Sequence, residues 1–446
     1  MEHADTIVAV ATASGRAGIG VVRLSGPRAR QIGHEICARE LSPRRATLAS
    51  FLAADAVPLD QGIALYFAAP GSYTGEDVVE LQGHGGPAVL QLLVQRCMEL
   101  GARPAAPGEF TQRAFLNGKL DLVQAESVAD LIDAASAAAV RGAMRSLSGV
   151  FSERIESIAR DLLDMRVLVE AVLDFPEEEL DVLRHAAIPE RLQQLAGRLR
   201  DLRSQAVQGR LLREGTRAVL VGKPNVGKSS LMNRLAQEEV AIVTDVPGTT
   251  RDALRYELAI EGVPIHVVDT AGLRDSADRV ERLGIERTLR EIARADVVLW
   301  VTEALADASG DVDVLPSGLP ASARIIHIIN KIDLSGEPAK RSEAGSELTI
   351  WLSAKTGDGI ELLRQGILEA AGWQGDGEAA FMARERHLAA LHDCTAALER
   401  AGRSLSGLEL LAEELRQAHR ALGEITGAVT ADDLLGEIFS RFCIGK

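Results

Sequence analysis

The sequence lacks the features of membrane, disulfide-rich and zinc-binding proteins. Its four cysteines, Cys37, Cys97, Cys394 and Cys443, are far apart and show no C-x-x-C spacing. This argues against a disulfide framework and against a zinc cluster. No apolar run approaches the roughly 18 residues that cross a bilayer. The first residues are acidic and carry no basic segment, so we expect no signal or transit peptide, no membrane attachment and a cytoplasmic protein.

An excess of positive charge is also missing. The net charge is −15, which argues against a nucleic-acid partner, although binding depends on local patches. Between Arg191 and Arg217 the chain has seven arginines against Asp201 and Glu214. A solvated helix face and an RNA-facing surface both account for this segment, and composition does not decide between them.

What the sequence does contain is an ordinary globular composition, with 446 residues of which 46% are hydrophobic and 25% charged. That length is enough for about three domains. Residues 1–118 alternate strand patterns, at 6–11, 20–24 and 63–67, with an amphipathic helix pattern at 86–100. We therefore predict an N-terminal α+β domain.

Helical periodicity follows in two separated stretches, residues 119–214 and 374–446. Pro176 and Pro189 divide the first stretch, and a glycine-rich linker precedes the second. We predict a multidomain α+β fold in which an α/β nucleotide-binding domain, residues 215–373, is inserted into a helical domain made of two sequence pieces. Because both ends of the inserted domain join the helices, its motion can be transmitted to them.

The functional prediction depends on residues 217–235. An apolar run leads into G-x-x-x-x-G-K-S at 222–229, the pattern of a phosphate-binding loop, and a helix pattern follows from Ser230. The glycines let backbone N–H groups approach a β-phosphate, and the positive end of the helix adds attraction. Lys228 would reach the β- and γ-oxygens, and the Ser229 hydroxyl would bind Mg²⁺.

Three later patterns indicate that the base is guanine. Asp269 and Gly272 end an apolar strand, which places a carboxylate at the water shell of Mg²⁺ and an N–H near the γ-phosphate. The N-K-x-D pattern at 330–333 ends another strand, and Asp333 can accept two N–H bonds from a guanine edge, which adenine cannot supply. Residues 353–355 form a further base-contacting loop. Together the four patterns predict a domain that binds GTP.

Five further stretches are more specific than these motifs. They are 15–26 (GRAGIGVVRLSG), 72–77 (SYTGED), 107–111 (PGEFT), 113–122 (RAFLNGKLDL) and 442–446 (FCIGK). In these stretches, and along its whole length, the chain resembles the tRNA-modification GTPase family called MnmE or TrmE.

The resemblance implies an N-terminal domain that forms a homodimer and binds 5-formyl- or 5,10-methylene-tetrahydrofolate. It also implies an FAD-dependent partner, MnmG (GidA), with which the chain would add an aminomethyl or carboxymethylaminomethyl group to C5 of the wobble uridine of certain tRNAs. The folate contacts carry over to Arg23, Glu80, Lys119 and Lys446, whose charges suit glutamyl carboxylates and a pterin edge. Cys443 lies in the terminal motif, and both a role near the modification chemistry and a buried, idle thiol remain open.

The hydrolytic machinery departs from that of many small GTPases. The residue after Asp-x-x-Gly is Leu273 instead of a glutamine, and leucine cannot orient water. Arg274, Asp275, Asp278 and Glu281 follow in the same loop and are the candidates for that role. The resemblance assigns it to Glu281, acting through a bridging water.

No arginine finger is evident in the sequence. The resemblance implies K⁺ in its place, held by the Asn225 side chain and by backbone carbonyls of Thr244, Val246 and Thr249. Thr250 fits the switch threonine that closes on Mg²⁺ and the γ-phosphate. In the family two nucleotide domains pair across their switch faces, so dimerisation is expected to be part of K⁺-stimulated GTP hydrolysis.

The residues predicted to contact GTP are Asn225, Val226, Gly227, Lys228, Ser229, Ser230, Thr244, Asp245, Val246, Pro247, Gly248, Thr249, Thr250, Asp269, Thr270, Ala271, Gly272, Asn330, Lys331, Asp333, Ser353, Ala354 and Lys355. Two other functions remain compatible with the nucleotide motifs. One is a ribosome-assembly switch, which usually carries an RNA-binding module that is not visible here. The other is a folate-dependent one-carbon transferase with a regulatory nucleotide domain.

Overall fold

The computed structural model describes residues 5–174, 187–238, 255–269, 293–304, 320, 322–345, 347–375, 381–405, 407–428, 432–440, 442 and 445. The chain divides into two compact units. The first unit comprises residues 1–129, 147–168 and 412–446, and the second comprises 130–146 and 169–411. Each unit thus combines segments that are far apart in the sequence.

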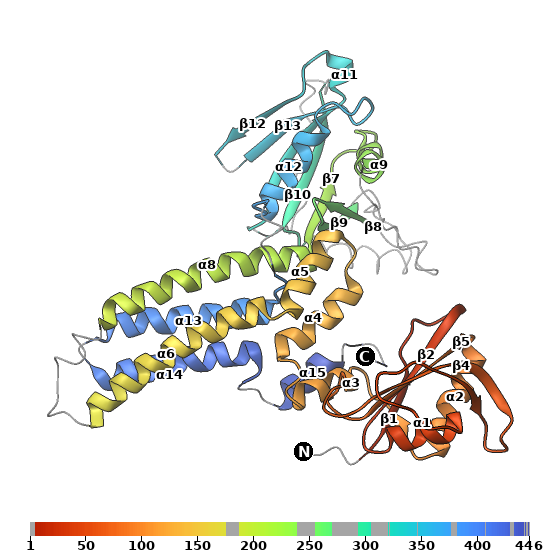
Figure 1. The fold of residues 1–446 in the computed structure, drawn as a ribbon. Coiled ribbons are helices and arrows are strands. Elements are labelled where there is room, and N and C mark those ends of the chain that lie inside the picture. The colour runs from red at the N-terminus through yellow and green to blue at the C-terminus, as the bar shows by residue number, and fades with distance from the viewer. Residues whose placement is uncertain are drawn as a thin grey trace, which may run out of the picture. The chain divides into compact units, whose positions relative to one another are not determined.

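The first unit contains a six-stranded sheet with the order β3-β4-β5-β2-β1-β6. Figure 1 labels β1, β2, β4 and β5 of this sheet. The strands are β1 (Ile7–Val10), β2 (Ala17–Ser25), β3 (Thr47–Leu52), β4 (Pro58–Phe67), β5 (Val78–Gly85) and β6 (Arg103–Pro104). Neighbouring strands are antiparallel except for β1 and β6. The three predicted strands are confirmed as β1, β2 and β4, and β2 and β4 are longer than expected.

Two helices, α1 (Ala29–Cys37) and α2 (Pro87–Glu99), pack against this sheet. The predicted helix at 86–100 is confirmed as α2. Pro87 begins it, at a position where the missing N–H is not needed. Leu90, Leu93 and Cys97 recur at helical spacing and join the sheet core. An apolar stripe on a helix and an apolar face on a sheet therefore form this core.

A fully buried arginine connects the N-terminal segment to helix α3 (Glu109–Leu116). The side chain of Arg113 is 0% exposed and donates to the carboxylates of Asp5, Glu76 and Glu109. Arg103 adds a second guanidinium that contacts both Asp5 and Glu109. A buried charge is stable only when it is paired, so this cluster holds the start of the chain, a loop and a helix together.

The first unit also holds most of α4 (Leu122–Asp133), α6 (Val150–Asp174) and α14 (Leu408–Thr426) and all of α15 (Asp432–Ser440). Phe439 and Phe442 pack with Leu122 and Ala125 in an apolar cluster. Gly445 lies so close to β1 that an added Cβ would be 2.2 Å from the Val10 carbonyl oxygen. Gly445 of the C-terminal motif therefore lies against the N-terminal strand.

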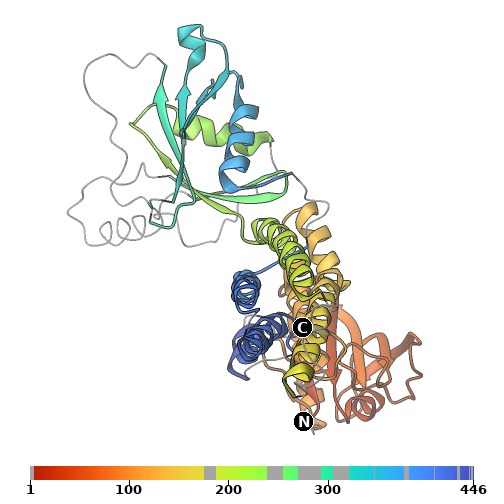
Figure 2. The ribbon, with the colours of Figure 1, turned by 90° about the vertical axis from the view of Figure 1, so that its left-hand side faces the viewer.

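The second unit contains a seven-stranded sheet with the order β12-β13-β11-β10-β7-β9-β8. Figure 2 shows this sheet in green to cyan. The strands are β7 (Thr216–Val221), β8 (Arg255–Ile260), β9 (Val263–Asp269), β10 (Val297–Glu303), β11 (Arg324–Asn330), β12 (Lys340–Ala344) and β13 (Glu347–Trp351). The five inner strands are parallel, and the edge strands β8 and β12 are antiparallel to their neighbours. Leu231 and Leu235 of α9 (Lys228–Glu238) share a core with Leu363 and Ile367 of α12 (Ile360–Ala371). A short helix, α11 (Ile332–Ser335), follows β11.

The described part of the second unit also contains α5 (Ala137–Leu147), α8 (Ile188–Glu214) and α13 (Glu385–Arg403). Pro189 lies in the first turn of α8, where proline is tolerated, and Pro176 is outside the described residues. None of the helices in the described ranges is both long and apolar enough to cross a bilayer. An N-terminal α+β sheet domain, helices from two parts of the chain and an inserted α/β sheet confirm the predicted fold class.

Most of the arginine-rich segment, residues 191–217, forms α8. This helix packs against α13, and its leucines at 192, 195, 199 and 202 are buried. Arg210 pairs with Glu385 at 2.7 Å, and Arg213 pairs at 2.8 Å with the buried carboxylate of Asp130. Asp130 also accepts a hydrogen bond from Arg384. These contacts favour a structural role over an RNA-facing surface for at least these two arginines.

The turn between β8 and β9 is attached to the helices of the same unit. Ser136 donates a hydrogen bond of 3.0 Å to the Gly262 carbonyl, and a Cβ on Gly262 would be 2.6 Å from that of Ala138. On its other side Trp373 Nε1 donates to Glu261 at 3.2 Å. This turn therefore joins the α/β sheet to the start of α5.

The ion pairs around Arg113 predict how the stability of the fold depends on pH. Burial alone would raise the pKa of Glu109, but hydrogen bonds from Arg103, from the Ala106 N–H and from Arg113 lower that pKa to about 2. A carboxylate with a lowered pKa stabilises the fold fully above its ordinary value, near 4.5, and loses that contribution as the pH falls toward 2. Glu109→Gln should therefore lower stability at pH 7 by about 3 kcal/mol and flatten the acid dependence.

Hydrogen exchange of the peptide 103–116 in the full chain, corrected for the intrinsic rate at each pH, measures this effect. Glu99→Gln is the matched control, because Glu99 is an exposed carboxylate in an ion pair with Arg96. Equal protection of wild type and Glu109→Gln at pH 7 would contradict the proposed stabilisation.

Candidate nucleotide-binding site

The sheet of the second unit brings the predicted motifs to one edge. Its parallel strands all end at the same side, and in such sheets ligands bind outside the carboxyl ends of the strands. The phosphate-binding loop follows β7, residues 330–333 follow or end β11, and residues 353–355 follow β13. Asp269 ends β9 in register with Leu220 near the end of β7.

The phosphate-binding loop needs its two glycines for space as well as for conformation. Gly222 and Gly227 have φ angles of 149° and 97°, which other residues rarely adopt. A Cβ on Gly222 would be 2.3 Å from the Val301 carbonyl oxygen, and one on Gly227 would be 2.3 Å from Asn330 Nδ2. The loop therefore fits against β10 and β11 only with glycine at both positions.

Lys228 begins α9, and its side chain folds back over the loop. The residue is only 7% exposed, and Nζ donates to the carbonyls of Gly222 at 2.6 Å and Lys223 at 2.9 Å. An ammonium has three donors, so these two contacts orient the charge and leave one donor for an anion. This is the arrangement that the sequence pattern predicts for a phosphate-binding lysine.

The side chain of Asn330, at the end of β11, connects the phosphate-binding loop to the loop after β13. It is 2% exposed. Its Nδ2 donates to the Val226 carbonyl at 2.8 Å, and its Oδ1 accepts from the Ala354 N–H at 3.0 Å. A single buried amide therefore holds the phosphate-binding loop and the loop after β13 at fixed positions relative to β11.

The carboxylate of Asp333 is held at the exposed end of the site. The buried Ser353 hydroxyl donates to Asp333 Oδ1 at 2.7 Å and accepts from the Thr356 N–H at 3.2 Å. Arg234 of α9 supports the same loop by donating to the carbonyls of Ala354 and Lys355. Asp333 is thereby oriented while its other oxygen remains available to a ligand.

The predicted metal ligands are only partly described. Ser229 lies exposed in the first turn of α9, and Asn225 lies exposed in the loop with a φ of 67°. The backbone of Asp269 is described, but its side chain is not. Eleven of the predicted GTP-contacting, metal-binding and catalytic residues lie outside the described residues: Thr244, Asp245, Val246, Pro247, Gly248, Thr249, Thr250, Thr270, Ala271, Gly272 and Glu281.

In the first unit, two of the predicted folate residues form a pair. Arg23 of β2 and Glu80 of β5 are directly opposite in register, and their charged atoms are 2.9 Å apart. The Arg23 guanidinium lies 5.7 Å from the centre of the Tyr73 ring and 5.8 Å from that of Phe110. The predicted residues Lys446 and Cys443 are outside the described residues.

Lys119, the remaining folate residue, contacts the loop that carries Tyr73. Its Nζ donates to the Pro70 carbonyl at 3.1 Å, and its stem lies near Gly75. Arg23 and Lys119 therefore both border the loop of residues 70–75. Sequence reasoning did not identify the two aromatic rings beside Arg23, because no spacing in the sequence relates residues 73 and 110 to residue 23.

Sequence reasoning also missed Glu303, which ends β10. Its Oε1 lies 2.6 Å from Lys331 Nζ, which in turn donates to the Asn225 carbonyl at 2.7 Å. The sequence did offer one signal for Glu303: it is a polar residue that ends an apolar strand, and the carboxyl ends of these strands form the edge where a ligand binds.

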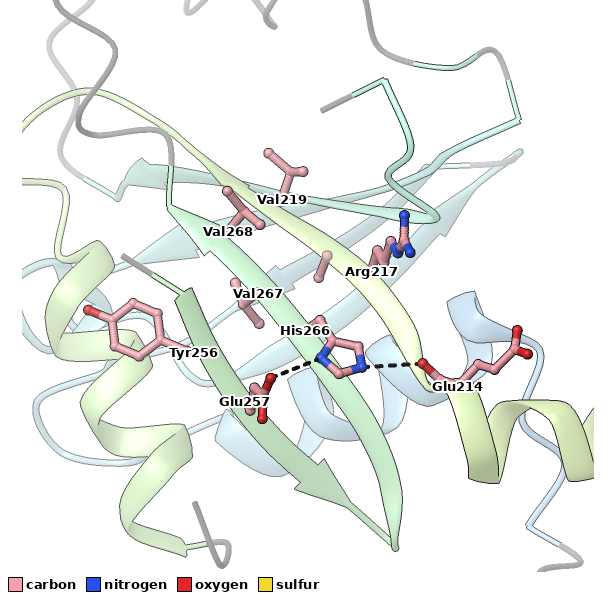
Figure 3. Close-up of a pocket in the computed structure, with 9 residues that line it drawn as sticks. Glu214, Arg217, Val219, Tyr256, Glu257, His266, Val267 and Val268 are labelled. Carbon is pink, nitrogen blue, oxygen red and sulfur yellow. Dashed lines mark hydrogen bonds and ion pairs between the residues drawn. The ribbon is translucent and has the colours of Figure 1, made fainter. Parts of the chain in front are cut away.

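A cavity of about 240 Å³ lies elsewhere on the same sheet, against β7, β8 and β9 (Figure 3). His266 lies within it, with one ring nitrogen 3.2 Å from the Glu214 carbonyl oxygen and the other 3.7 Å from the Glu257 carboxylate. None of the residues that line this cavity belongs to the predicted site. The nucleotide motifs therefore define a separate location, at the carboxyl edge.

Comparison with known proteins gives matches along the whole chain. The family model "GTP-binding protein TrmE N-terminus" matches residues 6–119, and the model "MnmE helical domain" matches residues 122–443. The chain is 57% identical over 443 residues to the tRNA modification GTPase MnmE of Azoarcus sp. (strain BH72), covering 99% of this chain and 98% of that protein. It is 57% identical over 442 residues to the protein of the same name from Thiobacillus denitrificans, with the same coverage. For the Neisseria meningitidis serogroup C (strain FAM18) protein of that name, the identity is 53% over 448 residues and both chains are covered completely.

Proposed function

The chain belongs to the MnmE family of tRNA modification GTPases, and from this premise we propose how its residues bind and hydrolyse GTP and how they take part in tRNA modification. The observation that carries the proposal is the Asn330 amide, which joins the phosphate-binding loop to the loop after β13. Through it the phosphate and base motifs belong to one site. The family relationship makes this chain a GTPase that acts in tRNA modification.

We propose that Asp333 selects guanine. Its carboxylate accepts the two N–H groups of the guanine edge, and an adenine edge cannot make both bonds. The Ser353 hydroxyl supports this role by fixing one carboxylate oxygen. The Lys228 ammonium and the N–H groups at the start of α9 receive the phosphates.

Mg²⁺ would be held by the hydroxyls of Ser229 and Thr250, with Asp269 in its water shell. The exposed Ser229 hydroxyl follows Lys228 directly, and the register of β9 brings Asp269 to the same edge, so the donors suit a hard cation. The ion would neutralise charge on the transferring phosphate. Glu281 would orient the attacking water, because Leu273 cannot.

K⁺ would be held by the Asn225 side chain and by the carbonyls of Thr244, Val246 and Thr249. Asn225 is exposed, and its left-handed backbone places it at the turn of the phosphate-binding loop. An amide and carbonyl oxygens suit a large monovalent cation. We propose that pairing of two nucleotide domains completes this cation site and stimulates hydrolysis.

In the first unit we propose a tetrahydrofolate one-carbon donor at Arg23, Glu80, Lys119 and Lys446. A guanidinium and a carboxylate on neighbouring strands, beside two aromatic rings, suit a ligand with a pterin ring and glutamyl carboxylates. The first unit would also form the homodimer. The proposed domains of the whole chain are residues 1–118, 119–214, 215–373 and 374–446.

With an FAD-dependent MnmG partner, the chain would direct an aminomethyl or carboxymethylaminomethyl group to C5 of the wobble uridine. Cys443 lies in the terminal motif that includes Gly445, and Gly445 packs against β1.

GTP turnover should depend on the alkali cation. At saturating GTP and matched ionic strength, phosphate release is expected to be at least about tenfold faster in K⁺ than in Na⁺, because Na⁺ is too small for a cage of carbonyl oxygens. Asn225→Ala should abolish the difference. Equal turnover of the wild type in the two buffers would show that the cation site is wrongly assigned.

Mass analysis of wobble uridines tests the function in cells. A deletion strain should lack the C5 modification, wild type should restore it, and Glu281→Ala should not, although it should bind GTP with near-normal affinity. Glu286 is not part of the proposed machinery, so Glu286→Ala serves as a control that should restore modification. Fully modified anticodons in the deletion strain would rule out the proposed function, and lost GTP binding in Glu281→Ala would make that residue structural.

A further inference from the structure

Glu303 contacts the nucleotide site from a strand that contributes none of the predicted residues. It ends β10, and its Oε1 is 2.6 Å from Lys331 Nζ. The same Nζ donates to the Asn225 carbonyl at 2.7 Å. One ammonium therefore joins β10, the base-recognition motif and the phosphate-binding loop.

The residue that carries that ammonium and the residue whose carbonyl it contacts share an unusual backbone conformation. Asn225 has a φ of 67° and Lys331 a φ of 66°. Both lie in the left-handed region, which non-glycine residues adopt at a cost and keep only when their surroundings hold them there. The hydrogen bond from Lys331 Nζ to the Asn225 carbonyl links these two strained positions directly.

The pairing of β10 with β11 brings the Glu303 carboxylate close to the Lys331 ammonium. Glu303 is the register partner of Asn330, the residue before Lys331. The next N–H, that of Ala304, donates to the Asn330 carbonyl at 2.9 Å. The carboxylate and the ammonium therefore start from neighbouring positions on two paired strands, and the carboxylate does not need a long reach.

A lysine side chain is flexible and strongly hydrated, and without a counter-ion its ammonium can turn toward solvent. Glu303 and Lys331 have side chains that are 33% and 31% exposed. The carboxylate engages one donor of the ammonium and so keeps another on the Asn225 carbonyl. The ion pair thereby restricts the conformation of the phosphate-binding loop at Asn225.

We propose that Glu303 is a positioning residue for GTP binding and hydrolysis: through Lys331 it holds Asn225 in the left-handed conformation from which the Asn225 side chain reaches the alkali cation. This inference rests on the proposed function, because it takes Asn225 as the K⁺ ligand and Lys331 as part of the guanine motif. Glu303 itself would touch neither the nucleotide nor the metal ion. It also couples the base-binding loop to the cation site.

Glu303→Gln tests the proposal, because glutamine keeps the size of the side chain and removes its charge. The K⁺ concentration for half-maximal GTP hydrolysis should rise about two- to fivefold, as should the rate of GDP release, as expected for a partly exposed ion pair. The kcat at saturating K⁺ should stay near that of the wild type. An ion pair that serves only stability would move neither the K⁺ response nor GDP release.

The matched control is Glu369→Gln. It makes the same chemical change in a carboxylate of the same unit that pairs with Arg341 at the edge strand β12. This variant should leave the K⁺ response and GDP release unchanged. Equal shifts in Glu369→Gln and Glu303→Gln would attribute the effect to net charge and overturn the proposal.

A double-mutant cycle with Lys331→Met identifies the route of the effect. GDP release is measured with fluorescent GDP in a stopped-flow instrument, which resolves fast as well as slow release. If Glu303 acts through Lys331, Glu303→Gln should cause no further change in the Lys331→Met background, and additive changes would overturn the proposal. A wild type without K⁺ stimulation would refute the proposed cation site, whereas a wild type with K⁺ stimulation and an unaltered Glu303→Gln would refute only the role of Glu303.

Discussion

The hydrogen bonds of the Asn330 side chain are the interaction on which the nucleotide site depends. Burying an amide is costly unless its donor and acceptor are both paired. Here the donor contacts the phosphate-binding loop and the acceptor contacts the loop after β13. Either loop can change its position only by leaving a buried polar group without its partner. Gly227 belongs to the same constraint, because any larger residue would overlap Asn330.

Around this amide the site is organised by charge. Lys228 folds over the phosphate-binding loop, and Lys331 reaches the same loop from the base motif. At the opposite end of the sheet, the turn between β8 and β9 contacts Ser136 and Trp373. The two strands of that hairpin connect to the segments that carry Thr250 and Gly272. In the proposed site Thr250 and Gly272 contact the nucleotide, so a change there would have a covalent and hydrogen-bonded route to the helices of the same unit.

Much of the site was predictable because its motifs combine spacing with chemistry. The phosphate-binding loop, Asn330, Asp333 and Ser353 follow apolar strands, and parallel strands bring their carboxyl ends together. The fold class was predictable for a similar reason, since strand and helix periodicities change along the chain. The contacts of Glu303, of the rings beside Arg23 and of Arg113 were not predictable, because they pair residues that are distant in sequence and obey no spacing rule. Composition also left the arginines of α8 ambiguous. For Arg210 and Arg213, the ion pairs with Glu385 and Asp130 indicate a structural role.

The most direct test of this account is the affinity of GDP for Asn330→Asp, measured by calorimetry on the full chain. Aspartate keeps the acceptor for the Ala354 N–H and replaces the donor to the Val226 carbonyl with a second oxygen. If the buried amide joins the loops as described, the dissociation constant should rise at least about fivefold, because the loss of a buried donor costs about 1–3 kcal/mol. An unchanged dissociation constant would contradict the central claim that this amide assembles the site.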